Sequence, residues 1–258
     1  MDLQLNDRLF LVGGATAGFG NAVARALISE GANIIAVARG EEKLRVFASL
    51  FPEKVEAICG DITDSELIKA IDEIIGNRRL DGALINAGGP PAKSFLETTL
   101  EDWDVSYFQL LRWKVEMLKT LLPRFRKQEY GRIVFVESIS VKQPIENLVL
   151  SNSYRAAVAG FVKTLSQEVG KEGITLNLLA PGYHETDAVK RVIQKKSEVT
   201  GLAYDEVAKQ MLAQVPVGRM GQPDEFAGLA LWLLSPLSGY ITGQTISVDG
   251  GRVAGIFG

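Results

Sequence analysis

A glycine-rich segment near the start of the chain has the composition and spacing of a phosphate-binding turn. Glycines occupy positions 13, 14, 18 and 20, directly after the apolar residues 9–12. We expect a buried strand, a tight turn and the start of a helix, because residues 21–28 have helical apolar spacing. The first N–H groups of a helix attract anions, and glycines let a pyrophosphate approach them closely. The segment therefore predicts a bound dinucleotide, with a purely structural strand–helix turn as the alternative.

The composition limits the class of protein. A chain of 258 residues that is 47% hydrophobic fits one α/β domain with a sizeable core. The 28 Lys and Arg nearly balance the 31 Asp and Glu, and no basic block interleaves with aromatic residues, so small ligands are expected rather than nucleic acid. A single cysteine, Cys59, and a single histidine, His184, argue against an internal disulfide and a metal cluster. The polar N-terminus and short apolar runs predict a cytoplasmic protein without a membrane span.

Strands and helices are expected to alternate, because short apolar runs are separated by amphipathic segments. Strands are expected at residues 9–12, 33–38, 55–59, 82–85, 132–136, 174–179 and 245–248. Helices are expected at residues 21–28, 41–50, 65–75, 102–126, 151–170 and 223–234, and the helix at 102–126 is expected to be interrupted or bent near Pro123. This order predicts an α/β fold, a single-domain, doubly wound, Rossmann-like parallel sheet of about seven strands with helices on both faces. One domain spans residues 1–258, and a charged, helix-patterned lobe at about 184–220 is expected to cover the substrate.

Ligands of such sheets bind outside the carboxyl ends of the strands, where several parallel strands end together. Small or polar residues follow six of the predicted strands, namely residues 13–20, Arg39, Asp61, residues 86–88, Ser138 and residues 181–182. One glycine turn could be an ordinary loop, but small or polar residues at six separate strand ends are harder to explain in that way. It strengthens the prediction of a dinucleotide site.

The chain resembles the short-chain dehydrogenase/reductase family over nearly its whole length. The spacing Gly14-x-x-x-Gly18-x-Gly20 matches the cofactor turn of that family, although Gly13 stands where the family usually has threonine. The sequence Asn-Ala-Gly at residues 86–88 matches the turn after its fourth strand. The chain is similar in particular to the 3-oxoacyl-(acyl carrier protein) reductases.

The resemblance also implies roles for individual residues and an assembly. Asp61 matches the acidic residue placed against the adenine, and Pro181, Gly182 and Thr186 resemble the segment that covers the nicotinamide amide. The implied cofactor-binding residues are Gly14, Gly18, Phe19, Gly20, Arg39, Asp61, Ile62, Asn86, Ala87, Gly88, Arg155, Pro181, Gly182 and Thr186. The resemblance further implies a homotetramer or homodimer, built through residues 102–126, residues 151–170 and the C-terminal strand region.

Arg39 bears on the choice of cofactor. It follows the second predicted strand directly, where an acidic residue binds the ribose 2′-hydroxyl of NAD and a basic residue binds the 2′-phosphate of NADP. NADP(H) is therefore favoured, with NAD(H) as the other choice. The alternative is a solvated surface arginine beside Glu41 and Glu42.

The catalytic residues of the family are matched only in part. Ser138 corresponds to the serine that binds the substrate oxygen, but the same register places Ser151 at the tyrosine site and Arg155 at the lysine site. Leu110 falls at the asparagine site. A serine hydroxyl is a weaker acid than a phenol, and the serine side chain is shorter than that of tyrosine. A guanidinium does not deprotonate as an ammonium does. The chain therefore matches the cofactor-binding half of the family better than the catalytic half.

Three other residues are candidates for the proton donor. Tyr154 lies three residues beyond Ser151, and an adjacent Arg155 would make its phenol more acidic. An alternative register makes Tyr154 the family tyrosine but places a valine at the lysine site. His184 and Lys142 are the other two, and an ordinary structural or surface role is the alternative for each.

Two functions are consistent with these residues. The first is an NAD(P)-dependent oxidoreductase that transfers hydride between the nicotinamide and a small carbonyl or alcohol. The second is a catalytically impaired nucleotide-binding protein, a sensor or scaffold on the same fold. We favour the oxidoreductase, and nothing in the sequence identifies its substrate.

Overall fold

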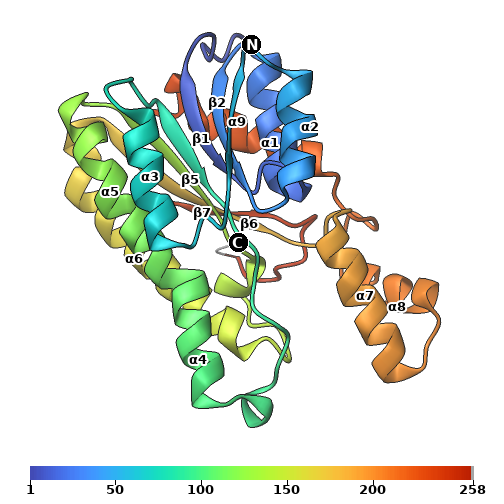
Figure 1. Cartoon of the computed structure of the whole chain (residues 1–258). Helices are drawn as coiled ribbons and strands as arrows, with labels where there is room; N and C mark the ends of the chain where they lie inside the picture. The colour runs from blue at the N-terminus through green and yellow to red at the C-terminus, as the bar shows by residue number, and fades with distance from the viewer. Residues whose placement is uncertain (257–258) are drawn as a thin grey trace.

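A seven-stranded parallel sheet forms the centre of the computed structural model, which describes residues 1–256 (Figure 1). The strand order is β3-β2-β1-β4-β5-β6-β7, as the predicted doubly wound fold requires. The strands are β1 (Leu9–Gly13), β2 (Asn33–Ala38), β3 (Val55–Cys59), β4 (Gly82–Ile85), β5 (Gly131–Val136), β6 (Ile174–Pro181) and β7 (Thr245–Val248). Strands β5 and β6 are buried along their whole length, because helices cover both faces of the sheet.

Three helices pack on each face of the sheet. One apolar cluster joins the strands to α1 (Gly18–Ser29), α2 (Glu41–Leu50) and α9 (Pro223–Leu234). A second cluster on the other face joins them to α3 (Ser65–Ile75), α5 (Trp113–Lys127) and α6 (Val149–Val169). The chain runs outward from β1 to β3 and then returns to β4 beside β1. The predicted turn after β1 therefore lies where the strand order reverses, at the position where such sheets bind ligands.

The predicted interruption of the helix near Pro123 is wrong. Pro123 lies inside a continuous α5, and the irregular turn is instead a π-helix, η2 (Phe108–Arg112), between α4 (Leu100–Tyr107) and α5. The buried residues on both sides of Pro123 hold the helix against the sheet. A π-turn inserts one extra residue and rotates the helix that follows it. Both Leu110 and Lys114 thereby face the interior, with exposed fractions of 1% and 2%.

The residues predicted as an inserted lobe form two helices, α7 (Asp187–Thr200) and α8 (Tyr204–Leu212). They share a small apolar cluster of their own, centred on Ile193, Val207 and Met211. Figure 1 shows α4 on one side and the α7–α8 pair on the other, both extending beyond the ends of the strands. Within the described residues, no helix is long and apolar enough to cross a membrane.

We predict that Gly20→Ala destabilises the protein by about 1–3 kcal/mol, because overpacking forces neighbouring atoms apart. A Cβ at Gly20 would lie 2.3 Å from the Gly14 carbonyl oxygen, which belongs to the backbone and cannot rotate away. Gly228→Ala in α9 is the matched control, since nothing lies within 4 Å of its added Cβ. It should be neutral or stabilising by up to about 1 kcal/mol. Chemical denaturation of both variants measures the difference, and equal stabilities would contradict the close approach.

Candidate functional site

The glycine turn leaves the first turn of α1 open to a ligand. Gly14 and Gly18 have φ values of +66° and +50°, which residues with a side chain rarely adopt. Ala17 occupies the N-cap position, and no side chain of the described residues caps the helix there. The outermost N–H groups of α1 therefore lack a side-chain acceptor at the positive end of the helix dipole. This is the arrangement that binds a phosphate.

Asn86 joins the glycine turn to the end of β4. Its side-chain Nδ2 donates a hydrogen bond of 3.0 Å to the Gly13 carbonyl oxygen. A Cβ at Gly13 would lie 2.5 Å from the Asn86 carbonyl oxygen and 2.9 Å from Cδ1 of Ile62. The close packing of these two strand ends explains the glycine where the related family usually has threonine. Gly88, two residues later, has nothing within 4 Å of an added Cβ, so the loop beyond Asn86 borders open space.

Arg39 and Asp61 lie at neighbouring strand ends beyond the glycine turn. Their charged groups are 3.8 Å apart, and the side chains are 76% and 45% exposed. Asp61 accepts hydrogen bonds from the backbone N–H and the hydroxyl of Thr63, at 3.0 and 2.9 Å. Asp61 is therefore fixed, whereas the Arg39 guanidinium projects into solvent. That leaves its donors accessible to an anionic group.

Residues 181–186 close the other side of the turn. The Gly182 N–H donates to the Val248 carbonyl oxygen at 2.9 Å, and a Cβ at Gly182 would lie 2.8 Å from that of Asp249. Thr186 caps α7, and its Cγ2 lies 3.6 Å from an added Cβ at Gly18. The segment therefore runs over the start of α1. The family resemblance predicts that this segment covers the nicotinamide of the cofactor.

His184 is enclosed by aromatic rings. Only 2% of it is exposed, and its ring lies 5.0 Å from the Phe19 ring and 6.2 Å from the Phe226 ring. Its Nδ1 is 3.3 Å from the Gly182 carbonyl oxygen. Burial lowers the pKa of the imidazole, so the neutral ring is favoured. The Phe19 side chain also belongs to this packing, because its ring lies 4.3 Å from that of Phe226.

Ser138, Ser151 and Arg155 come from two adjacent elements. Ser138 follows β5 and its Oγ accepts a hydrogen bond from the Ser140 N–H at 3.1 Å, which starts the short helix η3 (Ile139–Val141). Ser151 lies in the first turn of α6, and its Oγ accepts from Arg155 Nε at 3.0 Å. The fold therefore links the two residues predicted at the tyrosine and lysine sites of the family through one hydrogen bond.

A buried carboxylate beside this pair was not predicted from the sequence. Glu137, with a fully buried side chain, pairs through Oε2 with Arg155 Nη1 at 2.8 Å and through Oε1 with Lys114 Nζ. The Lys114 side chain is 3% exposed. Burial lowers the pKa of its ammonium, the neighbouring Glu137 opposes this, and Arg155 adds to it. Three charged side chains therefore meet behind Ser151.

A signal for this cluster was present in the sequence. Lys114 occupies an inward position on α5 together with Met117, Leu121 and Phe125, which are all fully buried. A lysine on an apolar helix face, with a glutamate at the end of a buried strand, indicates a buried ion pair. The pairing itself joins residues 23 positions apart and needs the sheet to bring them together.

The alternative donors predicted from the sequence lie elsewhere. The Tyr154 hydroxyl donates to the Trp103 carbonyl oxygen at 2.9 Å, and its ring packs on Trp103 of α4. Desolvation raises the pKa of the Tyr154 phenol, which is opposite to the acidification expected from Arg155. Lys142 follows η3 directly, and desolvation lowers the pKa of its ammonium. Neither residue hydrogen-bonds to Ser151 or Arg155 within the described chain.

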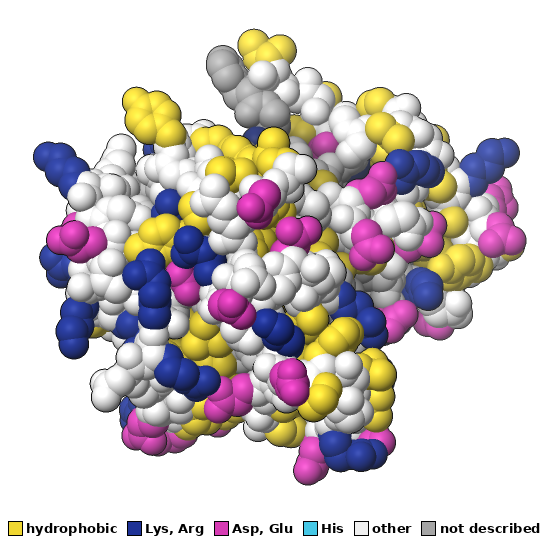
Figure 2. Space-filling model, turned by 90° about the horizontal axis from the view of Figure 1, so that it is seen from above, with side chains coloured by type: hydrophobic (Ala, Val, Ile, Leu, Met, Phe, Trp, Pro, Cys, Tyr) yellow, Lys and Arg dark blue, Asp and Glu magenta, His cyan; other side chains and the backbone are white. Residues whose placement is uncertain are grey.

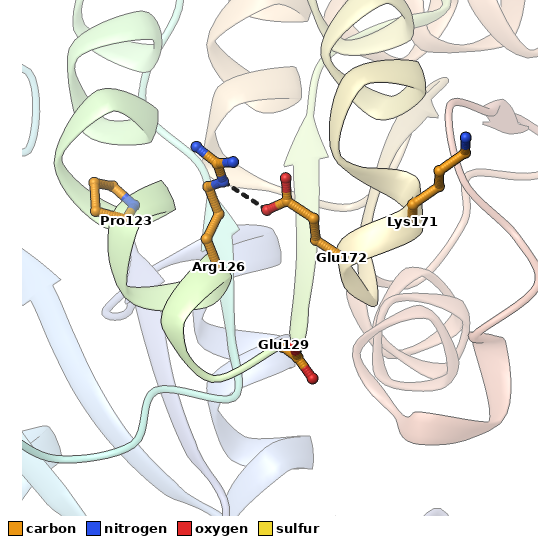
Figure 3. A pocket seen from close by; sticks show the side chains of 5 residues that line it. All are labelled: Pro123, Arg126, Glu129, Lys171 and Glu172. Carbon is orange, nitrogen blue, oxygen red and sulfur yellow. Dashed lines mark hydrogen bonds and ion pairs between the residues drawn. The ribbon is translucent and has the colours of Figure 1, made fainter.

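Other surface features show no comparable constellation. A hollow between α5 and the short helix η4 (Gly170–Glu172) is dominated by the ion pair of Arg126 with Glu172 at 2.6 Å (Figure 3). It adjoins the segments that lead into β5 and β6, at the amino ends of the strands, whereas the glycine turn lies at their carboxyl ends. Charged side chains of both signs are interspersed on the face drawn in Figure 2. In the part of the chain that the structure describes, no cluster of three His, Cys, Asp or Glu suits a metal ion.

The sheet order and the glycine turn at its switch point define a Rossmann-like α/β domain. The sequence model of a family described as "Enoyl-(Acyl carrier protein) reductase" matches residues 14–252. The 3-oxoacyl-[acyl-carrier-protein] reductase of Aquifex aeolicus is 31% identical over 97% of this chain and 99% of its own length. The corresponding reductase of Vibrio harveyi is 30% identical over 96% and 98%. The chain belongs to the short-chain dehydrogenase/reductase family of oxidoreductases.

Solved structures agree with this assignment. The L-sorbose reductase of Gluconobacter frateurii, complexed with NADPH and L-sorbose, has a TM-score of 0.92 at 26% identity, covering 99% of this chain and 100% of that one. YwfH, an NADPH-dependent reductase involved in bacilysin biosynthesis, has a TM-score of 0.91 at 26% identity, covering 97% of this chain and 100% of its own. The fold predicted from the sequence is thereby confirmed.

We predict that His184 makes stability depend on pH. Its folded pKa lies below the ordinary value of 6.5, so burying the neutral ring stabilises the fold above that pH and loses its effect as the pH falls below it. Denaturation between pH 7.5 and 5.5 should show a steeper loss for the wild type than for His184→Gln, which does not titrate. Parallel slopes for the two proteins would contradict this prediction.

Proposed function

We propose that this protein is an NADP(H)-dependent oxidoreductase that transfers hydride between the nicotinamide and a small carbonyl or alcohol. The observation that carries the proposal is the open N-terminus of α1, bordered by the Asn86 loop on one side and the Thr186 segment on the other. Three strand ends that are distant in sequence converge on it. They supply N–H donors and space, which a dinucleotide uses and a purely structural turn does not need.

The residues fit NADP(H) along the length of the site. Gly14, Gly18 and the N–H groups at the start of α1 would hold the pyrophosphate, because no Cβ blocks the approach. Arg39 would bind the ribose 2′-phosphate through its exposed fork. Asp61 would face the adenine end, and the segment from Pro181 to Thr186 would cover the nicotinamide. When bound, the cofactor supplies or accepts the hydride.

Side chains of the protein must hydrogen-bond to the substrate oxygen and stabilise the negative charge that develops on it. We assign Ser138 as the hydrogen-bond donor to that oxygen, since its hydroxyl proton is free while its Oγ accepts from Ser140. Ser151 can donate in the same way, because Arg155 uses its lone pair and not its proton. The Arg155 guanidinium supplies a positive charge directly beside the Ser151 hydroxyl. In this proposal, Ser151 and Arg155 stabilise the charge on the substrate oxygen from the positions at which the family resemblance implies a tyrosine and a lysine.

Assembly through the helices next to the site is also part of the proposal. Apolar side chains are exposed around α4, including Phe95 at 66%, Leu96 at 93%, Leu100 at 85% and Phe108 at 60%. Contiguous exposed apolar patches mark interaction surfaces, and these four side chains lie within fourteen residues of one another in the chain. They support a homodimer or homotetramer built through residues 102–126, residues 151–170 and the C-terminal strand region, with the exposed side chains around α4 at one contact. We place the protein in the cytoplasm, where its small-molecule substrate and NADP(H) are available.

The cofactor preference rests on Arg39. We predict that the wild type binds NADPH at least tenfold more tightly than NADH, since a charge-assisted fork to a phosphate is worth about 1.5–3 kcal/mol. Arg39→Ala should remove most of that difference while leaving NADH affinity unchanged. Fluorescence titration with both cofactors measures it. Equal affinities in the wild type would reject Arg39 as the determinant.

Turnover is the test of the reaction. A panel of ketones, oxoacyl thioesters and polyols is assayed with each cofactor, and Ser138→Ala should lower kcat by about 10²–10³ with unchanged NADPH affinity. Ser153→Ala, at an exposed position in the same helix as Ser151, is the control and should be neutral. Tight NADPH binding without turnover of any substrate would favour the catalytically impaired binding protein instead.

A further inference from the structure

Three elements of the fold meet at one buried carboxylate. Lys114 comes from α5, Arg155 comes from α6, and Glu137 stands between them at the end of β5. The Glu137 side chain has no exposed surface, and each of its two carboxylate oxygens forms an ion pair with one cationic side chain. Its backbone N–H donates to the Leu179 carbonyl oxygen at 2.9 Å, so the sheet fixes where the carboxylate stands. The position of Glu137 is therefore set by the core and not by the ligand site.

The contacts of Arg155 define which edge of its guanidinium is left free. Nε donates to Ser151 Oγ at 3.0 Å, and Nη1 pairs with Glu137 at 2.8 Å. Nη2 has no such partner in the described chain and lies beside the backbone of Gly89, 3.1 Å from where a Cβ would stand. Gly89 continues the loop whose Asn86 is bonded to the glycine turn. The free edge of the fork thus adjoins the proposed cofactor site.

We propose that Glu137 is a positioning residue, held by Lys114, that fixes the Arg155 guanidinium so that its free edge meets the ribose of the bound dinucleotide. This inference rests on the proposed function. The planar fork suits the task because two of its donors are already fixed by protein groups, which leaves one orientation for the third. Arg155 contacts the ligand in this arrangement, whereas Glu137 and Lys114 act through it.

Lys114 does not contact the ligand directly. Its Nζ is buried behind Glu137, with the Trp113 ring 5.7 Å away and Arg155 on the far side of the carboxylate. Its role is to satisfy the second oxygen of Glu137, which would otherwise be buried without a donor. The pair holds the Glu137 carboxylate in place, while the Arg155 side chain is 11% exposed.

The test uses a double-mutant cycle on NADPH affinity with the full-length protein. Glu137→Gln removes the charge that orients Arg155, and we expect it to weaken NADPH about tenfold, as Arg155→Lys should do alone. The double variant should be no weaker than the poorer single variant, because both changes remove one effect. Glu137→Asp keeps the carboxylate and should stay within about threefold of the wild type. Additive losses in the cycle would overturn the inference.

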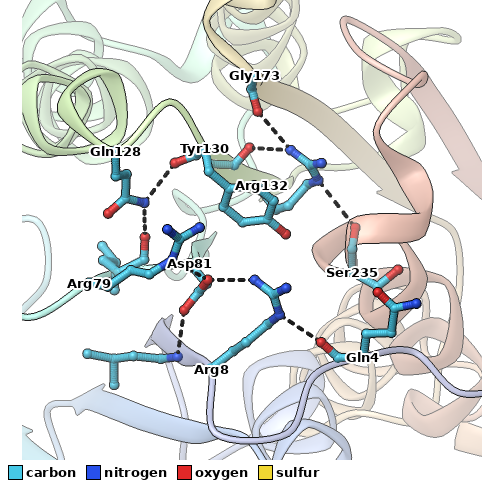
Figure 4. A network of polar contacts seen from close by, with 12 residues as sticks. Gln4, Arg8, Arg79, Asp81, Gln128, Tyr130, Arg132, Gly173 and Ser235 are labelled. Atoms are coloured by element: carbon cyan, nitrogen blue, oxygen red, sulfur yellow. Dashed lines mark hydrogen bonds and ion pairs between the residues drawn. The ribbon is translucent and has the colours of Figure 1, made fainter.

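A second buried carboxylate provides the matched control. Asp81 is 4% exposed and forms ion pairs with Arg8 at 2.7 Å and Arg79 at 3.0 Å. It lies close to Tyr130 and Arg132 at the amino ends of the strands, opposite the proposed site (Figure 4). Asp81→Asn should lower the melting temperature as Glu137→Gln does, but leave NADPH affinity unchanged. If Glu137→Gln and Glu137→Asp change affinity only in proportion to their loss of melting temperature, the role of Glu137 is structural and the inference fails.

Two further outcomes are distinguishable. Should Glu137→Gln fail to fold, the double variant Lys114→Met/Glu137→Gln removes the buried cation together with the anion and takes its place in the cycle. Wild-type affinity in that double variant would overturn the inference. A wild type that binds NADPH while the cycle is additive leaves the proposed function intact and rejects only the positioning role. A wild type that does not bind NADPH rejects both.

Discussion

A carboxylate without exposed surface, held between two cations, is the constraint on which the catalytic half of this site depends. Glu137 joins α5, α6 and the end of β5 through Lys114 and Arg155. Removing one partner of such a group costs about 3–5 kcal/mol, because it leaves a buried charge unpaired. The relative positions of the two helices at the strand ends are therefore tied to the charge state of this cluster.

The cofactor-binding half depends on a different constraint, the close approach of backbones. Gly13 and Asn86 are packed so tightly that a single Cβ would stand 2.5 Å from a carbonyl oxygen. Gly20 and Gly14 meet in the same way at the start of α1. These contacts need no charge and no side chain other than the Asn86 amide. The turn after β1 is thus built from backbone contacts and the region around Ser151 from a buried ion pair, so either can change in sequence while the other is retained.

The fold and the strand ends were predictable because they follow from local patterns. Continuous apolar runs gave the buried strands, and glycines gave the turn after β1. Local patterns gave the wrong position for the interruption of the long helix before β5. Pro123 lies inside a continuous α5, and the π-turn at residues 108–112 leaves no signature in composition. The Lys114–Glu137 pair was missed for a related reason. The apolar surroundings of each residue indicated burial, but only the sheet brings the two together as a pair.

The buried cluster also limits what chemistry the proposed reaction can use. A guanidinium keeps its proton throughout the physiological pH range, so Arg155 can hold charge and orient a ligand but cannot relay a proton. Tyr154, whose phenol is bonded to Trp103, is directed toward α4. The Ser151 hydroxyl lies beside the fixed positive charge, and the Ser138 hydroxyl follows β5 on the adjacent element. A reaction here must therefore stabilise the developing oxyanion first and take its proton from a hydroxyl or from water. Preorganised charge suits the first of those tasks, because it needs no reorganisation as the substrate reacts.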